Sequence, residues 1–456
     1  MTAGCRNPLL YLFIDFNSYF ASVEQQENPE LQARALAVAP LMTDSTCAIA
    51  ASYEAKRHGI QTGTPLREAK RLCPDLIVVP ARPDVYVDYH HRLIDEIERH
   101  IPVTKVWSID EMACKLDRTQ QTPEAAKALA RQIKQGIAER VGAHVKCSIG
   151  IAPSSLLAKV ATDMEKPDGL VILRSEDLPG PLLDLPLIDL PGIGQRMRQR
   201  LARAGIDDVA ALWAISPKHA RAIWGSVGGE RFWYALHGFD VPDLPTERSV
   251  IGHSRVLAPD SRAAPKAYLV ARTLVMKAAF RLRHYGLAAG GLMLAGDKWE
   301  KGWASHIRFS PTQDSFVFLR WLAAMWPDLV EKAGSRAKFH HVQVALFDLG
   351  SAGERQHDLF VRADRETSQA HRCEGLWGTI DRLNARYGRE ILTLASQLNQ
   401  KKLHYAGTKI AFSRVPERFE FHQTTVEDAE SRKAAIRMRK TLRERQLVGW
   451  GRNFSA

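Results

Sequence analysis

Short apolar segments, several of them interrupted by a single polar residue, run through the first half of the chain. Leu12–Phe16 is apolar except for Asp15, which predicts a buried strand that carries one carboxylate. Residues 105–117 predict a short buried strand, a tight turn and a returning strand. Two further buried strands are expected over Leu36–Ala39 and Cys47–Ala51. The first half therefore supplies several strands to its sheets.

Helical patterns alternate irregularly with these strands. Apolar residues recur at helical spacing over Asp84–His100, and a second helix is expected over Pro123–Val141. The strand Val145–Ile151 leads into a helix that bears Lys159. Because strands and helices mix without a regular strand–helix–strand alternation, we predict an α+β fold with a largely antiparallel sheet.

A helical region and a linker follow these elements in the chain. The segment Leu190–Gly194 precedes a helix expected over Gln195–Ala204, and its glycines allow backbone N–H groups to approach a phosphate. A plain helical packing unit is the alternative for this hairpin. Residues 241–249 have linker composition, with two prolines. Later elements are expected as strands at Ser249–His253, Gly291–Leu294 and Val342–Leu346, a basic helix over Ala264–His284, a helix and a short strand within 376–397, and a basic helix over Ser431–Arg445.

Three carboxylates occur where predicted strands end. Asp110 and Glu111 are adjacent in the turn, and they repel each other unless a cation lies between them. Asp15 interrupts an apolar strand, which rarely buries a lone carboxylate without a partner. If the two strands pair, all three side chains meet at one edge and form a set of hard oxygen ligands that suits Mg²⁺. A surface turn with two solvated acids is the alternative, but it leaves Asp15 unexplained.

Bulk properties narrow the class of protein. The chain has 456 residues, which corresponds to about three or four domains. Its 45% hydrophobic and 25% charged residues are ordinary for globular proteins. No apolar run approaches the roughly 20 residues of a membrane helix, and no signal peptide is recognisable. The six cysteines are widely spaced, so we expect reduced thiols in a cytoplasmic protein.

The net charge of +12 is unevenly distributed along the chain. Residues 246–456 contain 35 Lys and Arg against 21 Asp and Glu, a balance of +14, which leaves 28 against 30, or −2, in the first 245 residues. The acidic half carries the candidate metal site. The basic half suits a polyanion, most simply nucleic acid, although a basic surface alone is common among soluble proteins.

Five separated segments carry recognisable motifs. They are Phe13–Phe16 with Tyr19–Phe20, Ser52–Lys56, Ser108–Glu111, Asp163–Gly169 and Pro191–Gly194. Together, and in this order, they resemble the motifs of the Y-family translesion DNA polymerases, of the bacterial DNA polymerase IV and V kind. The match covers about residues 10–350 and continues weakly beyond. Each motif alone is weak, whereas all five in family order are specific.

This resemblance implies a right-hand polymerase. It divides the chain into a palm (8–29 and 76–170), fingers (30–75), a thumb with a helix-hairpin-helix (171–240), a linker (241–249), a little finger (250–350) and a C-terminal tail (351–456). In such an enzyme Asp15, Asp110 and Glu111 hold two Mg²⁺ ions, helped by the carbonyl of Phe16. The implied reaction is low-fidelity, template-directed addition of deoxynucleotides to a primer 3′ end, across damaged template bases.

The resemblance also assigns the nucleotide site. Phe20 matches the steric gate, whose ring leaves no room for a 2′-hydroxyl, and Ile49 matches a finger residue over the nascent base pair. Lys56 stands where the family usually has Arg, so it supplies charge but not a bidentate fork. The positions matched to the incoming nucleotide are Tyr19, Phe20, Ile49, Tyr53, Lys56 and Lys166.

DNA and protein partners are implied as well. Gln356–Phe360 resembles the bacterial sliding-clamp peptide, with Gln356, Leu359 and Phe360 as its fixed positions; a random exposed loop is the alternative. Leu383–Gly388 resembles the tail of polymerase V catalytic subunits, and the sequence leaves open a need for that enzyme's small partner subunit. DNA contacts are expected from Lys159, Gly192, Gly194, Arg255, Arg272 and Lys277.

Two rival functions remain at this point. A catalytically inactive relative could serve as a DNA- and clamp-binding scaffold, but it has no need to keep three carboxylates. A non-enzymatic DNA-binding protein explains the charge and leaves Asp15, Asp110 and Glu111 unexplained.

Overall fold

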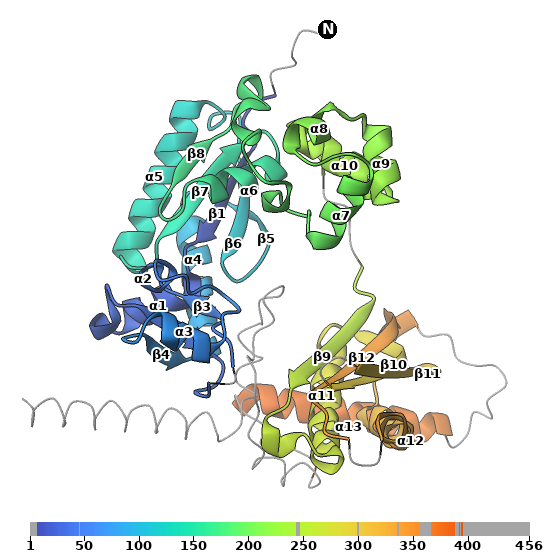
Figure 1. Cartoon of the computed structure of the whole chain (residues 1–456). Coiled ribbons are helices and arrows are strands. Elements are labelled where there is room, and N and C mark those ends of the chain that lie inside the picture. Colours follow the sequence, from blue (N-terminus) through green and yellow to red (C-terminus); the bar gives the residue numbers. More distant parts are fainter. Residues whose placement is uncertain are drawn as a thin grey trace, which may run out of the picture. The chain divides into compact units, whose positions relative to one another are not determined.

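The computed structural model describes residues 7–44, 46–242, 247–298, 301–334, 337–354, 366–387, 392 and 394. These residues form two compact units, one ending at residue 242 and the other beginning at residue 247 (Figure 1). Each unit has its own sheet and its own buried core. No helix within the described ranges is long and apolar enough to span a membrane.

The first unit is built around a five-stranded sheet. Its strands are β5 (Val103–Val106), β6 (Glu111–Lys115), β1 (Tyr11–Phe16), β7 (Cys147–Ala152) and β8 (Leu170–Ile172), in that spatial order. All neighbouring pairs are antiparallel except β7 and β8, so the expected largely antiparallel sheet is confirmed. The upstream strand of the predicted hairpin is not buried, because β5 is the edge strand and has only one neighbour in the sheet.

Four helices lie between or beside these strands in the chain order of the first unit. Phe13 and Ala113, which lie opposite each other on β1 and β6, share one buried core with Leu157 and Ala158 of α6. Met112 and Cys114, which point to the other face of β6, are also fully buried. These helices are α1 (Tyr19–Glu27), α4 (Pro83–Ile97), α5 (Pro123–Arg140) and α6 (Ser155–Met164).

A second, small sheet has the order β3-β2-β4. Its elements are β2 (Leu36–Ala39), β3 (Ala50–Ala51) and β4 (Ile77–Pro80), with helices α2 (Tyr53–Lys56) and α3 (Leu66–Leu72). Because β4 pairs with β2, residues 77–80 belong to this sheet rather than to the palm segment expected from residue 76. The strand expected over Cys47–Ala51 is shortened to β3, since the backbone of Ala48 bonds to Gly63 and Thr64 instead.

Residues 171–240 are expected to be helical, and after the end of β8 at Ile172 this region contains only helices and short 3-10 turns as regular elements. The helix expected over Gln195–Ala204 is observed as α7, one residue shorter. Gly192 before it has φ of +94°, a left-handed conformation that favours glycine. The helices are α7 (Gln195–Arg203), α8 (Val209–Ala214), α9 (Pro217–Trp224) and α10 (Val227–Leu236).

The second unit is a four-stranded antiparallel sheet with helices on one face. The sheet order is β11-β10-β12-β9, and Leu292, Leu294, Val344 and Leu346 turn toward the helical core. The elements are β9 (Val250–Val256), α11 (Ala264–His284), β10 (Leu287–Lys298), β11 (Lys301–Thr312), α12 (Ser315–Ala333) and β12 (His341–Ser351). The basic helix expected over Ala264–His284 is confirmed to the residue.

A further helix, α13 (Glu366–Tyr387), also belongs to this unit. Trp377 is buried and donates from its indole nitrogen to Asp314 at 3.0 Å, while Arg283 forks the carboxylate of Asp381 at 2.6 and 3.1 Å. The unit therefore extends beyond the boundary expected at residue 350. The predicted clamp peptide at 356–360 and the basic helix at 431–445 lie outside the described residues.

Candidate active site

Two neighbouring strands bring carboxylates to one edge of the first sheet. In the register of β1 and β6, Asp15 lies directly opposite Glu111. The backbone N–H of Phe16 donates to the carbonyl of Asp110 at 2.9 Å, which fixes the turn beside the end of β1. This is the side-by-side pairing that the sequence predicts.

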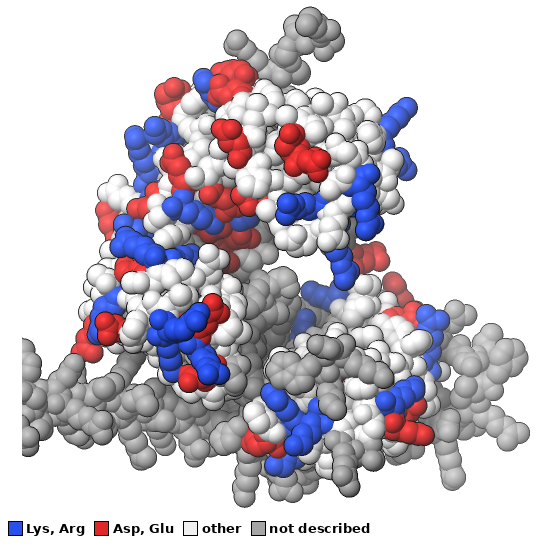
Figure 2. Space-filling model, in the orientation of Figure 1, with Lys and Arg blue, Asp and Glu red and all other residues white. Residues whose placement is uncertain are grey.

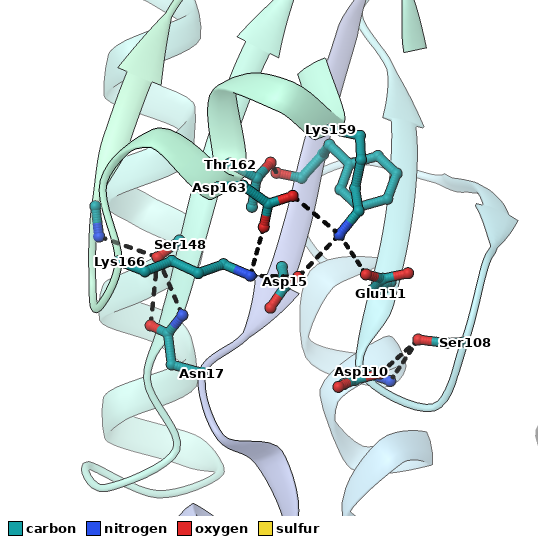
Figure 3. Close-up of polar contacts among 12 residues, drawn as sticks. Asp15, Asn17, Ser108, Asp110, Glu111, Ser148, Lys159, Thr162, Asp163 and Lys166 are labelled. Carbon is teal, nitrogen blue, oxygen red and sulfur yellow. Dashed lines mark hydrogen bonds and ion pairs between the residues drawn. The ribbon is translucent and has the colours of Figure 1, made fainter. Parts of the chain in front are cut away.

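Two lysines connect these carboxylates (Figure 3). Lys159 on α6 donates to Asp15 at 3.1 Å and also to Glu111. Lys166 donates to Asp15 at 2.8 Å and forms a 2.6 Å ion pair with Asp163. Asp15 therefore accepts hydrogen bonds from two ammonium groups. These are the charged partners that a carboxylate buried in an apolar strand requires.

The protonation states of the two lysines follow from this arrangement. Burial opposes the charged form of Lys159, but the negative charges of Asp15, Glu111 and Asp163 outweigh it and raise the pKa of the ammonium. Lys166 behaves in the same way: burial opposes its charge, and Asp15 and Asp163 raise its pKa. Both side chains are therefore fully charged at neutral pH.

Asp110 stands apart from the lysine network. Its carboxylate accepts from the hydroxyl of Ser108 at 2.5 Å, and Figure 3 shows the pair at the turn, away from Lys159. Burial raises the pKa of Asp110 to about 6, the Ser108 hydrogen bond opposes this, and the charges of Asp15 and Glu111 add to the rise. A bound cation would reverse this effect.

These oxygen donors fit a hard divalent cation, although they are not gathered around one point. Within the described ranges, no three His, Cys, Asp or Glu side chains form a ready-made ligand cluster. Asp15 and Glu111 nevertheless share one cationic group, Lys159, so a cation between these two carboxylates is compatible with the fold. Carboxylate and carbonyl oxygens of this kind suit Mg²⁺, which keeps much of its shell for water and phosphate.

A residue that sequence reasoning missed holds the turn from behind. His90 on α4 is buried, and its Nδ1 lies 2.7 Å from the carbonyl oxygen of Ile109, which requires the proton on that nitrogen. Burial lowers the pKa of His90 to about 4, so the ring is neutral at pH 7. The peptide on each side of Asp110 is thus fixed, by His90 on one side and by Phe16 on the other. Only the helical pattern of α4 could have indicated an inward-facing histidine.

Comparisons with known proteins agree with this arrangement. Residues 14–163 match the family model described as impB/mucB/samB. DNA polymerase IV of Moorella thermoacetica is 33% identical over 410 residues, which cover 87% of this chain and 98% of that protein. DNA polymerase IV of Bacillus velezensis is 27% identical over 411 residues, covering 87% of this chain and 94% of the relative.

The chain belongs to the Y-family of DNA polymerases. It is a DNA-directed DNA polymerase of the translesion type. Solved structures agree on the fold: a Y-family polymerase chimera based on Dbh has a TM-score of 0.65 at 22% identity, covering 75% of this chain and 99% of that chain. An insertion ternary complex of Dbh DNA polymerase has a TM-score of 0.51 at 22% identity, covering 74% and 98%.

In this Y-family polymerase, the proposed steric gate has firm support beneath it. The ring of Phe20 stacks on Tyr86 with centroids 4.5 Å apart and an interplanar angle of 17°. The Tyr86 hydroxyl donates to Glu24 at 2.8 Å, and Arg82 forks the same carboxylate at 2.9 and 2.6 Å. Tyr19, also predicted at the nucleotide site, is buried and donates to the backbone of Tyr86. The charged pair behind Tyr86 holds the platform on which Phe20 rests.

The loop that carries Lys166 is tied to the end of β1. Asn17 is buried, accepts from the Asp168 backbone N–H at 2.8 Å and donates to Ser148 at 3.1 Å. Ser148 in turn accepts from the Gly169 N–H at 3.2 Å. Asn17 and Ser148 therefore set the position of Lys166, and sequence analysis assigned neither of them a role.

The small sheet contributes the other predicted nucleotide residues. The ammonium of Lys56 lies 4.4 Å from the centre of the Tyr53 ring. Burial and the positive charge of Lys166 lower the pKa of Lys56, and burial raises the pKa of Tyr53. An anion placed between the two ammonium groups would offset this repulsion. Ile49 lies just before β3 and is half-buried.

The predicted DNA residues are distributed unevenly. Gly192 and Gly194 lie before the basic helix α7, and Figure 2 shows Lys and Arg side chains on this part of the first unit. Lys159 is engaged by the carboxylates instead. In the second unit Arg255 shares a sheet face with Val342, which is buried toward the helices.

Helix α11 carries the remaining two predicted contacts, Arg272 and Lys277, both half-buried. The face of the second sheet that points away from the described helices bears His306 and Arg308, which sequence analysis did not single out. Arg308 is largely exposed and pairs with Asp348 at 3.6 Å. A strict alternation along β11 was the signal that could have indicated them.

Proposed function

We propose that this polymerase copies damaged templates with low fidelity and adds each deoxynucleotide by two-metal-ion catalysis. The pairing of Asp15 with Glu111 on adjacent strands, with Asp110 in the turn beside them, carries the proposal. Asp15, Asp110, Glu111 and the carbonyl of Phe16 would hold two Mg²⁺ ions. Such ions, when bound, stabilise the charge that develops on the attacking and leaving oxygens.

The residues of this chain position the reactants. The primer 3′-oxygen forms a bond to the α-phosphorus of the nucleotide, the bond from that phosphorus to the pyrophosphate oxygen breaks, and the hydroxyl proton passes to solvent. Lys166, Lys56 and Tyr53 are proposed to take the triphosphate, and a negative triphosphate offsets the mutual repulsion of the two lysines. Positioning and charge neutralisation supply most of the rate acceleration.

Sugar selection and partner binding complete the proposal. Phe20, supported by Tyr86, is proposed to exclude the 2′-hydroxyl of ribonucleotides. The thumb glycines and the basic residues of both units are proposed to bind primer-template DNA through its phosphates. The peptide at Gln356, Leu359 and Phe360 is proposed to bind the bacterial sliding clamp, and a polymerase V-type small subunit remains a second partner to test.

Primer extension by the full-length protein tests the proposal. We expect extension of a primed template with Mg²⁺ and none with a chelator. An inactive scaffold would bind primer-template equally well under both conditions and extend it under neither. A measurement of binding beside extension therefore separates an enzyme from a scaffold.

A further inference from the structure

The indole of Trp107 lies exposed next to the carboxylates. It follows the edge strand β5, and 43% of its surface is accessible, together with 39% of the neighbouring Val106. A single exposed apolar side chain is common on protein surfaces, so the informative feature here is the position of the indole beside the carboxylates. The catalytic roles proposed above make no use of this ring.

Strand register places Trp107 on the same sheet face as the catalytic carboxylates. Residues directly opposite in an antiparallel pair share a face. Lys105 lies opposite Ala113, and Ala113 lies opposite Phe13. Because side chains two residues apart also share a face, Trp107 joins Lys105, and Asp15 joins Phe13. The contact between the Phe13 and Trp107 rings, with centroids 5.9 Å apart, agrees with this assignment.

The backbone of Trp107 is paired directly with that of Glu111. The Trp107 N–H donates to the carbonyl of Glu111 at 2.9 Å, so the two residues are neighbours across one strand spacing of about 4.8 Å. The ammonium of Lys105 lies 4.1 Å from the centre of the indole ring. An aromatic surface and a cation thus stand side by side, a combination that binds nucleotides through base and phosphate.

The position of Trp107 relative to the carboxylates indicates which part of the substrate it can contact. In the sheet order, β5 lies on one side of the Asp15–Glu111 pair and β7 on the other. Lys166, the proposed triphosphate residue, belongs to the β7 side, and Figure 3 shows it opposite Ser108 across Asp15 and Glu111. The incoming nucleotide and Trp107 therefore occupy opposite sides of the reaction centre.

We propose that Trp107 and Lys105 form a platform for the last nucleotide of the primer. The indole packs against its base and deoxyribose, and the Lys105 ammonium pairs with its phosphate. This inference rests on the proposed function, because polymerisation requires a primer 3′-hydroxyl at the carboxylates. The nucleotide that bears this hydroxyl is the part of the substrate that comes within one strand spacing of Trp107.

Photocrosslinking of the full-length protein tests the platform directly. A primer with 5-iododeoxyuridine at its 3′ end, annealed to template, is irradiated with the enzyme, and the crosslinked peptide is identified by mass spectrometry. We expect the peptide that contains Trp107. The same label on the template base opposite should not reach this peptide. A 3′-end crosslink that maps to any other residue overturns the proposal.

Steady-state kinetics provide a second, independent test. Trp107→Ala and Trp107→Leu should raise the KM for primer-template roughly tenfold, with a smaller effect on kcat, because base–aromatic stacking is lost. Trp107→Phe keeps a ring and should restore most of the affinity. Phe239→Ala removes another exposed aromatic residue of the same unit and serves as the matched control.

The outcomes separate this platform from the proposed function. A wild-type KM in Trp107→Leu, measured with a normal thermal unfolding midpoint, overturns the platform while the polymerase mechanism stands. If the wild-type protein binds primer-template but extends no primer, the proposed function fails. The crosslink from the primer 3′ end then still decides what Trp107 contacts.

Discussion

The proposed catalytic edge of the first sheet, where Asp15, Asp110 and Glu111 lie, and helix α11 of the second unit both hold basic side chains that are largely withdrawn from solvent. The partners of these side chains differ. Lys159 and Lys166 contact Asp15, yet 18% and 29% of their side chains remain accessible. On α11, Arg283 is only 7% exposed and is committed to Asp381 of α13. Lys159 and Lys166 are accessible enough to contact a substrate, whereas the ion pair of Arg283 with Asp381 holds α13 against the second unit.

The difference between these basic residues follows from the hydrogen bonds that each one makes within the protein, more than from its being Lys or Arg. Four of the five N–H donors of Arg283 are used, two by Asp381 and two by Gln313 and Ser315. Lys159 and Lys166 instead contact carboxylates that repel one another, so a competing cation can release them. A basic residue is therefore a good candidate for ligand binding where its partners themselves need more positive charge.

Charge balance adds a second lesson. Residues 246–354 contain 15 Lys and Arg against 9 Asp and Glu, or +6, whereas residues 355–456 contain 20 against 12, or +8. These sum to the +14 of the basic half. More than half of its excess charge therefore lies after the second sheet, and the proposed attraction of DNA by the basic half would depend strongly on that segment.

The largest expected effect comes from the catalytic edge. Asp110→Ala or Glu111→Ala should lower nucleotide addition by at least about 1,000-fold, because transition-state charge loses its stabilisation. Binding of primer-template should persist, since the proposed DNA contacts come from basic and aromatic side chains and not from these two carboxylates. Gel-based extension and a fluorescence binding assay check the two halves of this prediction. Extension by either variant near the wild-type rate would sink the two-metal mechanism.

The choice between ribonucleotides and deoxynucleotides tests the proposed steric gate, Phe20, and the ring that supports it. Phe20→Ala should raise incorporation of ribonucleotides relative to deoxynucleotides on the order of 100-fold, because truncation opens space for the 2′-hydroxyl. Tyr86→Leu should show a smaller rise, since it removes the stacked ring beneath Phe20. The measurement is the ratio of kcat/KM for the two nucleotide types. An unchanged ratio in Phe20→Ala would show that another residue is the gate.

Clamp dependence tests the chain beyond the second sheet. Replacement of both Leu359 and Phe360 by Ala should leave synthesis without clamp intact and remove stimulation by the bacterial clamp, an effect of roughly 100-fold in effective concentration. Product length on a clamp-loaded primed circle, at several salt concentrations, measures it. Equal stimulation of both proteins would place the tether elsewhere, with Gln446 and Leu447 the next candidates.

His90 differs from the charged residues of the first sheet, because it is neutral at pH 7 and holds the turn of Asp110 through one hydrogen bond. His90→Ala should lower kcat about tenfold with little change in the KM for DNA, since the carbonyl of Ile109 loses its donor and the turn of Asp110 loosens. His90→Gln can still donate and should restore part of kcat. A change in KM alone would contradict a role in positioning the carboxylate.

The same histidine predicts a pH dependence of stability. Burial lowers the pKa of His90 from 6.5 to about 4, so between these values the unfolded chain binds a proton that the folded chain does not. The stabilisation is complete above pH 6.5 and is lost as the pH falls toward 4. From pH 7 to pH 5 the loss is on the order of 2 kcal/mol. Urea denaturation of wild type and His90→Gln should show a smaller loss in the variant.

The smallest effect is expected on catalysis from the second unit. Asp381→Asn should destabilise that unit by about 3 kcal/mol, because it leaves Arg283 buried and poorly paired, while nucleotide addition at saturating DNA stays near wild type. Thermal unfolding and extension assays measure the two quantities. Arg308→Ala, on the sheet face that points away from the described helices, is the matched variant, and it should weaken DNA binding without lowering stability. A loss of DNA affinity in Asp381→Asn with unchanged stability would reverse the assignment.

The sequence by itself determined the elements and the identity of the carboxylates. A lone Asp15 in an apolar strand, and adjacent Asp110 and Glu111 in a turn, are local conflicts that any fold must resolve, so they are visible without coordinates. Helix α11 was predicted to the residue because its apolar spacing is regular over 21 positions. The motif order was likewise enough to indicate the Y-family.

Tertiary structure alone decided which side chains act together. The roles of His90, Asn17 and Trp107 depend on partners that lie on other elements: His90 contacts a turn 19 residues away, and Asn17 a loop 151 residues away. The docking of α13 on the second unit has the same cause, since Arg283 and Asp381 are 98 residues apart. The residue pattern of one element shows which of its side chains require a polar or apolar partner. Only the packed structure shows which distant element supplies that partner.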